Sequence, residues 1–404
     1  MNILMLNPVH PSVPHISAVR AWRFARELSA LGHRVVLVTK PVASGKPTGT
    51  NPLDGHDWAT PCVLACGNAP AVPGGTSGKG LFGKVGTAIG LLRQGGKDAQ
   101  WCKEAVRIST RLPEGLAPDV VWCTFGKGEA VVAARRIAKA LKRPWILDLK
   151  DSWELYVPRG LRHVMAWRLR GWTRATANAQ LTADLLRKWH GADPVIVYSG
   201  VEREFYPVQS RPPADATFVV NLVGSVYSRQ RLEQFLLGIR QWFDRLDATD
   251  HASFILNYFG GDVDMVRSVA GEMFPELPVR IHGYIPVEAL ARHCLEAAAN
   301  AYVALASNAG FHHKLLELLA TGKPVIAFPE ETSESIALAA SFGTPLRIAS
   351  NSLELAVILS QIHQGDSANV GCQRPDNGRK SYSWPDQARI LEQVFIEAIS
   401  RKAK

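Results

Sequence analysis

The chain has 404 residues, of which 47% are hydrophobic and 20% are charged, and its formal net charge is +10. This is ordinary globular composition, which argues against a disordered chain, and the length suits two domains of about 200 residues each. No apolar run approaches the ~20 residues needed to cross a bilayer, and the positive charge predicts an anionic partner: nucleotide phosphates, an anionic membrane surface or nucleic acid.

The first part of the chain reads as a strand, a helix and a second strand. Residues 2–7 form an apolar run typical of a buried strand, and Trp22, Ala25 and Leu28 have helical spacing within 19–31. Gly32 ends that helix, and the next strand covers 34–39. This order predicts a parallel, doubly wound sheet.

Residues 40–100 are rich in Gly and Pro, and we expect long loops there, followed by a helix over 99–111. Further along, the pattern predicts strands over 119–124, 144–149 and 194–198, a helix over 129–141, and a basic segment over 159–174.

The pattern then restarts, with a seam near 201–213. Apolar runs predict strands over 218–223, 254–259, 279–282, 301–305 and 325–328, and helical spacing predicts helices over 232–246, 265–274 and 287–298. The sequence therefore predicts an α/β protein with two Rossmann-like domains, each built on its own sheet.

The stretch from Phe311 to Phe328 contains a short apolar helix that ends at Gly322. Lys314 and Glu317 are three residues apart and share one face of this helix near its start. Lys314 could neutralise a diphosphate, and Glu317 could accept hydrogen bonds from sugar hydroxyls. The alternative is a solvated ion pair on an amphipathic helix, because such pairs are common.

Short motifs in order along nearly the whole chain resemble the GT-B glycosyltransferases, and among them the retaining enzymes of family 4. They are Gly32-His33-Arg34-Val35; Tyr198-Ser199-Gly200-Val201 with Phe205 and Pro207; Val223-Gly224-Ser225; Gly260-Gly261; His282-Gly283-Tyr284; Lys314 to Glu317 with Pro324-Val325-Ile326; and Tyr382-Ser383-Trp384.

The resemblance implies two Rossmann-like domains that face an interdomain cleft. Residues 1–200 would form the acceptor-side domain, completed by a C-terminal helix over 385–404, and residues 208–384 the domain that binds the nucleotide sugar. It also implies a hexosyltransferase-type enzyme that retains the anomeric configuration, needs no metal or other cofactor, and builds a surface polysaccharide or glycolipid. The partners would be a nucleotide sugar and a glycan or lipid-linked acceptor.

The donor site implied by the resemblance differs from the family pattern in two places. Ala309 stands where many members have the first of two glutamates, and Ser225 stands where many have an arginine. We therefore expect Arg229, and after it Arg231, to meet the diphosphate. The expected donor-binding residues are Gly224, Ser225, Arg229, Arg231, Gly283, Tyr284, Asn308, Ala309, Gly310, Phe311, Lys314, Leu315, Glu317, Thr332 and Ser333.

Several of these residues carry specific expectations. Backbone N–H groups of Asn308 to Phe311 could hold the sugar, and Tyr284 either stacks on the base or only packs. Glu330 and Glu331 would repel phosphate, so we expect both to point outward.

The catalytic group is expected to be Asp151, Arg229, Lys314 and Glu317. Asp151 follows the strand over 144–149, and the strand-end rule points it toward the cleft, where it would orient the acceptor hydroxyl; the alternative is a helix N-cap before Trp153. The other expected acceptor-side residues are His15, Ser17, Arg20 and Lys150.

Residues 157–177 contain five arginines and two tryptophans but no acidic residue. This pattern is typical of a helix on an anionic membrane surface, and the alternative is a solvated helix face. With no signal peptide recognised, we expect a cytoplasmic protein, attached peripherally to the inner face of the membrane if 157–177 binds lipid. Nucleic acid is disfavoured, because basic and aromatic residues alternate only in this segment.

Two other functions share the expected fold. A GT-B sugar-nucleotide epimerase would act on the donor without any acceptor. A nucleotide-sugar-binding protein without catalysis is suggested by Ala309. Donor turnover distinguishes these possibilities, and fold resemblance alone does not fix the substrate.

Overall fold

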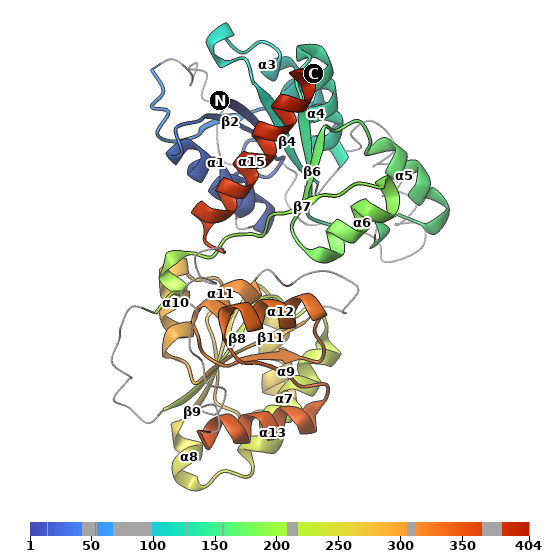
Figure 1. The fold of residues 1–404 in the computed structure, drawn as a ribbon. Coiled ribbons are helices and arrows are strands. Elements are labelled where there is room, and N and C mark those ends of the chain that lie inside the picture. Colours follow the sequence, from blue (N-terminus) through green and yellow to red (C-terminus); the bar gives the residue numbers. More distant parts are fainter. Residues whose placement is uncertain are drawn as a thin grey trace. The chain divides into compact units, whose positions relative to one another are not determined.

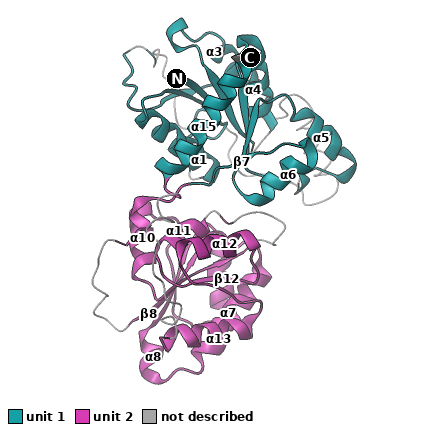
Figure 2. Cartoon of the chain, viewed as in Figure 1, with its two compact units in different colours: residues 1–199, 384–404 teal, residues 200–383 magenta. Residues whose placement is uncertain are grey.

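The computed structural model describes residues 1–13, 15–42, 53, 55–67, 99–125, 128–155, 157–207, 217–304, 312, 314–365 and 382–403. The chain divides into two compact units, coloured separately in Figure 2. Unit 1 comprises residues 1–199 and 384–404, and unit 2 comprises residues 200–383. Unit 2 is therefore one continuous segment, whereas the chain of unit 1 is interrupted.

Unit 1 is built on a parallel sheet of seven strands in the order β3-β2-β1-β4-β5-β6-β7. The strands are β1 (Asn2–Leu6), β2 (Arg34–Thr39), β3 (Cys62–Ala65), β4 (Val120–Phe125), β5 (Trp145–Leu149), β6 (Arg174–Ala177) and β7 (Val195–Ile196). All neighbouring strands pair in parallel, as the βαβ pattern predicted.

Helices cover both faces of this sheet (Figure 1). Along β1, Leu4 and Leu6 enter one core, whereas Ile3 and Met5 enter the other, since side chains alternate along a strand. The first core is completed by α3 (Ala99–Ser109), α4 (Gly128–Leu141), α5 (Arg162–Arg168) and α6 (Gln180–His190). The second is completed by α1 (Ile16–Ala30) and the C-terminal α15 (Trp384–Ala403).

Unit 2 has a parallel sheet of six strands in the order β10-β9-β8-β11-β12-β13. The strands are β8 (Phe218–Val223), β9 (Phe254–Phe259), β10 (Val279–Ile281), β11 (Ala299–Val303), β12 (Val325–Phe328) and β13 (Leu346–Ile348). The chain adds β9 and β10 on one side of β8 and then returns to build β11 on the other. The strand order therefore reverses between β8 and β11.

The α-helices in the described part of unit 2 are α7 (Arg229–Phe243), α8 (Ala248–Ser253), α9 (Val263–Met273), α10 (Val287–Glu296), α11 (Lys314–Ala320), α12 (Ser333–Phe342) and α13 (Ser352–His363). The apolar faces of α7, α9 and α13 pack with Val220 and Leu222 of β8 in one core.

A row of asparagines fixes the register of the three central strands of unit 2. Asn221 of β8 pairs in register with Asn257 of β9 and Asn300 of β11. Asn257 Nδ2 donates to Asn221 Oδ1 (3.1 Å), and Asn221 Nδ2 donates to Asn300 Oδ1 (3.2 Å) and to the carbonyl of His293 on α10 (2.9 Å). A slip by one residue would bury these amides without partners, so the row aligns the strand ends.

The fold class is confirmed: both units are α/β layers on a parallel sheet. Several elements were not predicted, namely β3, β6, β13, α6, α8, α12 and α13. The interpretation of residues 157–177 as a basic helix was wrong in part, because α5 covers only Arg162–Arg168. Arg174 begins β6, because the following Ala175, Thr176 and Ala177 are buried between β5 and β7.

Candidate functional site

The carboxyl ends of β8 and β11 are adjacent at the point where the strand order of unit 2 reverses. In open α/β sheets, loops leave such neighbouring strands in opposite directions, and the crevice between them binds ligands. Gly224 follows β8 and Ala304 follows β11. The residues around these two positions form the candidate site.

Glycines let the strand ends of β8, β9 and β10 approach each other closely. Gly224 N donates to the carbonyl of Phe259 (2.8 Å), and Gly260 N donates to the carbonyl of Gly283 (3.1 Å). A Cβ at Gly260 would lie 2.3 Å from the carbonyl oxygen of Gly224, which is too close for any side chain. Glycine is therefore required at Gly260, because the ends of β8 and β9 pack too closely there for a side chain.

The first turn after β8 is held by side chains from β9 and the loop that follows it. Val226 N donates to Asp262 Oδ2 (2.8 Å), and Asp262 N donates to the hydroxyl of Tyr258 (3.0 Å). Ser228 caps α7 by accepting from Arg231 N (3.3 Å). These bonds fix the start of α7, and with it the arginines of its first turn.

The two arginines of this turn have different settings. Arg231 Nη1 donates to the carbonyl of Ala304 at the end of β11 (2.6 Å), and Arg231 Nη2 donates to Glu330 after β12 (3.3 Å). Arg229 instead bonds Glu233 (2.9 Å), Ser268 (3.0 Å) and Glu272 (3.0 Å) on the exposed surface of α7 and α9. The preference for Arg229 over Arg231 is therefore reversed, because only Arg231 reaches the end of β11.

Lys314 and Glu317 form an ion pair with Nζ 2.7 Å from Oε2 at the start of α11. Burial alone would lower the pKa of Lys314, but the attraction of Glu317, helped by Cys294 and Glu202, outweighs it and raises the pKa. Lys314 is therefore a stable cation at neutral pH. Its side chain is 38% exposed, so an incoming anion can still reach it.

Tyr284 presents an aromatic face beside the glycines. Its side chain is 71% exposed, and a Cβ at Gly261 would lie 2.8 Å from its hydroxyl oxygen. The ring thus lies over Gly261, where a planar base could stack on it. Gly283, the residue before it, has φ +69°, which favours glycine.

The prediction that Glu331 points outward was wrong. Glu331 points inward: it accepts from the hydroxyl of buried Tyr302 (2.7 Å) and from Thr332 N (2.6 Å). Thr332 caps α12 by accepting from Ser335 N (3.1 Å), so its oxygen is already engaged, while Ser333 is exposed in the first turn. Glu330 is held by Arg231, and its side chain is 41% exposed.

Of the other residues expected to bind the donor, the structure describes Ser225 and Leu315 but not the four residues from 308 to 311. Ser225 lies in the turn after β8, and Leu315 is buried in the core, so only its backbone could face a ligand. Asn308, Ala309, Gly310 and Phe311 lie outside the residues that the structure describes.

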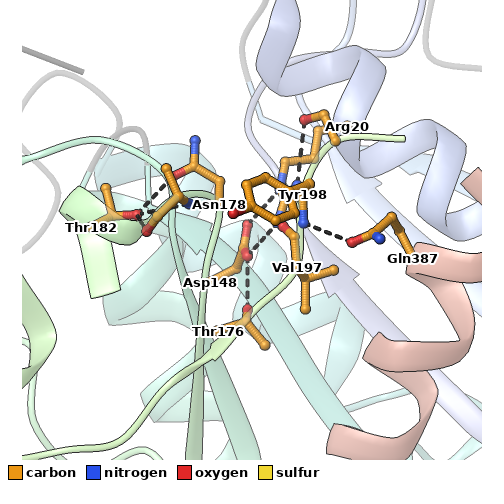
Figure 3. Close-up of polar contacts among 10 residues, drawn as sticks. Arg20, Asp148, Thr176, Asn178, Thr182, Val197, Tyr198 and Gln387 are labelled. Atoms are coloured by element: carbon orange, nitrogen blue, oxygen red, sulfur yellow. Dashed lines mark hydrogen bonds and ion pairs between the residues drawn. The ribbon is translucent and has the colours of Figure 1, made fainter. Parts of the chain in front are cut away.

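In unit 1, the prediction that Arg20 binds an acceptor was wrong (Figure 3). Its side chain on α1 is completely buried and donates twice to Asp148 of β5 (3.0 and 2.8 Å), and also to the carbonyl of Val197 (2.7 Å). Thr176 of β6 donates to the same carboxylate (2.7 Å). Arg20 therefore links α1, β5 and the segment after β7, since a buried charge pair needs all its hydrogen bonds.

The other expected acceptor-side residues lie around the carboxyl ends of β1 and β5. Asp151 is partly exposed, and its Oδ2 lies 3.7 Å from Nζ of buried Lys150. Burial, together with the charge of Arg20, lowers the pKa of Lys150 despite the neighbouring carboxylates. His15 caps α1, with Nδ1 accepting from Ser17 N (3.1 Å), and Ser17 is buried. His15 and Ser17 thus have structural roles, whereas the carboxylate of Asp151 is accessible.

His312 was missed by the sequence analysis. The ring is buried between Gly224 and Tyr302 at the reversal point, although its neighbours in sequence, Lys314 and Glu317, were singled out. The pair His312-His313 directly before Lys314 was the available signal.

In the described part of the chain, no three His, Cys, Asp or Glu side chains gather where they could hold a metal ion. The carboxylates of Asp262 and Asp264 have separate settings, because Asp262 holds the turn after β8 and Asp264 is exposed beside Arg267. Among the described residues, no helix combines the length and apolar character that crossing a bilayer requires.

No protein-family model matches this chain, and no curated protein sequence matches it. Solved structures do. A glycosyltransferase from Rickettsia africae is 12% identical, with a TM-score of 0.66 over 98% of each chain. HepE from Anabaena in complex with UDP-glucose is 16% identical, with a TM-score of 0.66 over 98% of this chain and 99% of that one. UDP-GlcNAc 2-epimerase from Neisseria meningitidis, bound to UDP-GlcNAc, is 13% identical, with a TM-score of 0.54 over 98% and 100%.

These similarities cover almost the whole chain and establish its fold. Both units are Rossmann-like, and the matching structures include a glycosyltransferase. Because a fold at this level of identity hosts several activities, the chemistry has to be inferred from the residues of the site.

Proposed function

We propose that this protein is a glycosyltransferase that binds a nucleoside diphosphate sugar at the strand-order reversal of unit 2 and transfers the sugar to an acceptor. The observation that carries the proposal is the position of two cations near the carboxyl ends of β8 and β11. Arg231 donates to the carbonyl of Ala304, and Lys314 is near enough to His312, which lies beside Gly224, to affect its pKa. Two cations suit a diphosphate, because they neutralise its charge.

In this proposal each residue of the site has a part. Arg231 and Lys314 neutralise the diphosphate and stabilise the negative charge that grows on it as the sugar leaves. Glu317 accepts from sugar hydroxyls, and Tyr284 stacks on the base. Since two protein cations supply the charge, the reaction proceeds without a metal, and the leaving phosphate takes the proton of the acceptor on the same face of the sugar, with retention.

The acceptor is proposed to be lipid-linked and to meet Asp151 of unit 1. Support comes from α5 and its flanks, where His163, Val164, Trp167 and Arg170 are exposed at helical spacing. Trp167 is 61% exposed, and residues 157–177 contain no acidic residue. An exposed tryptophan among arginines suits the headgroup region of an anionic membrane.

The test is a screen of nucleotide sugars against the purified chain. UDP-glucose, UDP-GlcNAc, GDP-mannose and ADP-glucose are added separately, and the melting temperature is measured. We expect at least one to stabilise the protein by several degrees and to be consumed when membrane extract supplies an acceptor. If none stabilises the protein and none is consumed, the proposal is wrong.

Epimerisation of the donor is the second candidate, favoured by the similarity to the UDP-GlcNAc 2-epimerase structure. An epimerase would convert the stabilising nucleotide sugar into its epimer with no acceptor present. Proton NMR of the sugar in the absence of membrane extract separates the two: an unchanged sugar excludes epimerisation.

A further inference from the structure

The reversal point of unit 2 contains a buried histidine that the proposed chemistry leaves unused. His312 is 9% exposed, and its ring stacks on Tyr302 of β11 with centroids 4.4 Å apart. On another side it lies against Gly224: a Cβ there would be 3.3 Å from Cε1 and 3.4 Å from Nε2. His312 therefore touches the ends of both strands between which the crevice opens.

One nitrogen of this ring has no partner among the residues that the structure describes. Nδ1 is buried and makes no hydrogen bond to any of them. The neighbouring polar side chains are engaged elsewhere, since the hydroxyl of Tyr302 donates to Glu331 and Lys314 pairs with Glu317. A buried polar atom left unpaired costs roughly 1–3 kcal/mol, so it needs a reason.

The ring is also uncharged. Burial, and secondarily the charge of Lys314, lowers the pKa of His312 to about 4. A neutral imidazole has one N–H and one lone pair, whereas an ionised phosphate only accepts hydrogen bonds. A sugar hydroxyl both donates and accepts, so it fits either tautomer of the ring.

We infer that His312 is a binding residue for the transferred sugar, and that its free nitrogen pairs with a sugar hydroxyl while Arg231 and Lys314 hold the diphosphate. This inference rests on the proposed function. In this arrangement the uncharged imidazole contacts the uncharged sugar, and the two cations contact the charged diphosphate.

The experiment compares His312→Leu with His312→Asn, because Asn keeps a polar group near the position of Nδ1 and Leu does not. Binding is measured by calorimetry with the nucleotide sugar that stabilises the wild type best and with its nucleoside diphosphate alone. We expect His312→Leu to lower the affinity for the nucleotide sugar tenfold or more, and the affinity for the nucleoside diphosphate less than threefold. His312→Asn should restore most of the lost affinity.

The inference is overturned if His312→Leu lowers the affinity for both ligands equally, or lowers the affinity for neither. A second readout needs no substitution: in wild-type protein with ¹⁵N-labelled histidine, one imidazole should shift on adding the nucleotide sugar but not the nucleoside diphosphate. Absence of this shift also overturns it. If the wild type binds no nucleotide sugar at all, the proposed function fails. If it binds one and the substitutions at His312 leave the affinity unchanged, only this inference fails.

Discussion

Arg229 and Arg231 are separated by one residue on the first turn of α7, yet only one of them reaches the strand ends. Arg231 contacts the carbonyl of Ala304, whereas Arg229 is spread over two glutamates and a serine on the outer surface. Successive helical positions diverge by about 100°, so a shift of two residues turns a side chain to another face.

Replacing Arg231 by Gln should weaken donor binding about tenfold to a hundredfold, because a charge-assisted contact to phosphate is lost. Calorimetry with the nucleoside diphosphate measures this directly. Arg229→Gln is the matched control, and its affinity should stay within about threefold of the wild type. Equal losses in the two variants would contradict our assignment of the diphosphate to Arg231.

Part of the candidate site could be predicted from sequence because it is local. Lys314 and Glu317 are three residues apart on one helix, so their pairing follows from helical geometry. The choice between Arg229 and Arg231 could not be made, because it depends on how Asp262 and Ser228 fix the start of α7. The burial of Arg20 depends on Asp148, 128 positions away, which no local pattern reveals.

At the scale of elements, the sequence predicted the apolar central strands well. It predicted helices such as α1, α4 and α7 but missed α6, α12 and α13. β8 and β9 have the predicted bounds, since their runs are buried and have clear ends. β3, β6 and β13 have only three or four residues each, and such short runs carry little periodicity. Their strand character comes from pairing with a neighbour along the sheet, which is a tertiary effect.

The exposed face of α5 gives a prediction about membranes. The double variant Val164→Ser, Trp167→Ser should bind vesicles of phosphatidylcholine and phosphatidylglycerol about tenfold more weakly than the wild type, because both residues bring apolar surface to the interface. Flotation of vesicles with bound protein measures this.

The matched control is Met273→Ser, which removes an exposed apolar side chain from α9 in unit 2. Its binding should equal that of the wild type, and all binding should fall with added salt. If the wild-type protein does not bind anionic vesicles, the prediction that α5 binds a membrane surface is wrong.

At the scale of the whole molecule, unit 1 depends on a helix that follows unit 2 in the chain. Phe395 and Leu391 of α15 are buried in the same core as Phe24 of α1 and Met5 of β1, and Trp384 meets Phe24 edge to face. Gln387 also accepts from Tyr198 N (2.8 Å). Unit 1 therefore lacks part of one core until the last twenty residues have folded onto it.

Phe395→Ala should lower the free energy of unfolding of unit 1 by about 3–5 kcal/mol through the cavity it leaves. Ile396→Ala, on the adjacent exposed position, should change it by less than about 1 kcal/mol. Of the 11 tryptophans only Trp242 belongs to unit 2, so tryptophan fluorescence during urea unfolding reports mainly on unit 1. Identical midpoints for the two variants would refute this dependence.

The paired carboxylates of unit 2 have a consequence for turnover. Arg231 is paired with Glu330, and Lys314 is paired with Glu317, so each cation already has a counterion within the protein. Under the proposed function, a diphosphate would have to displace an internal carboxylate from each cation, which lowers the net free energy of its binding. Under the proposed function, the same carboxylates would compete for the cations after sugar transfer and favour release of the nucleotide.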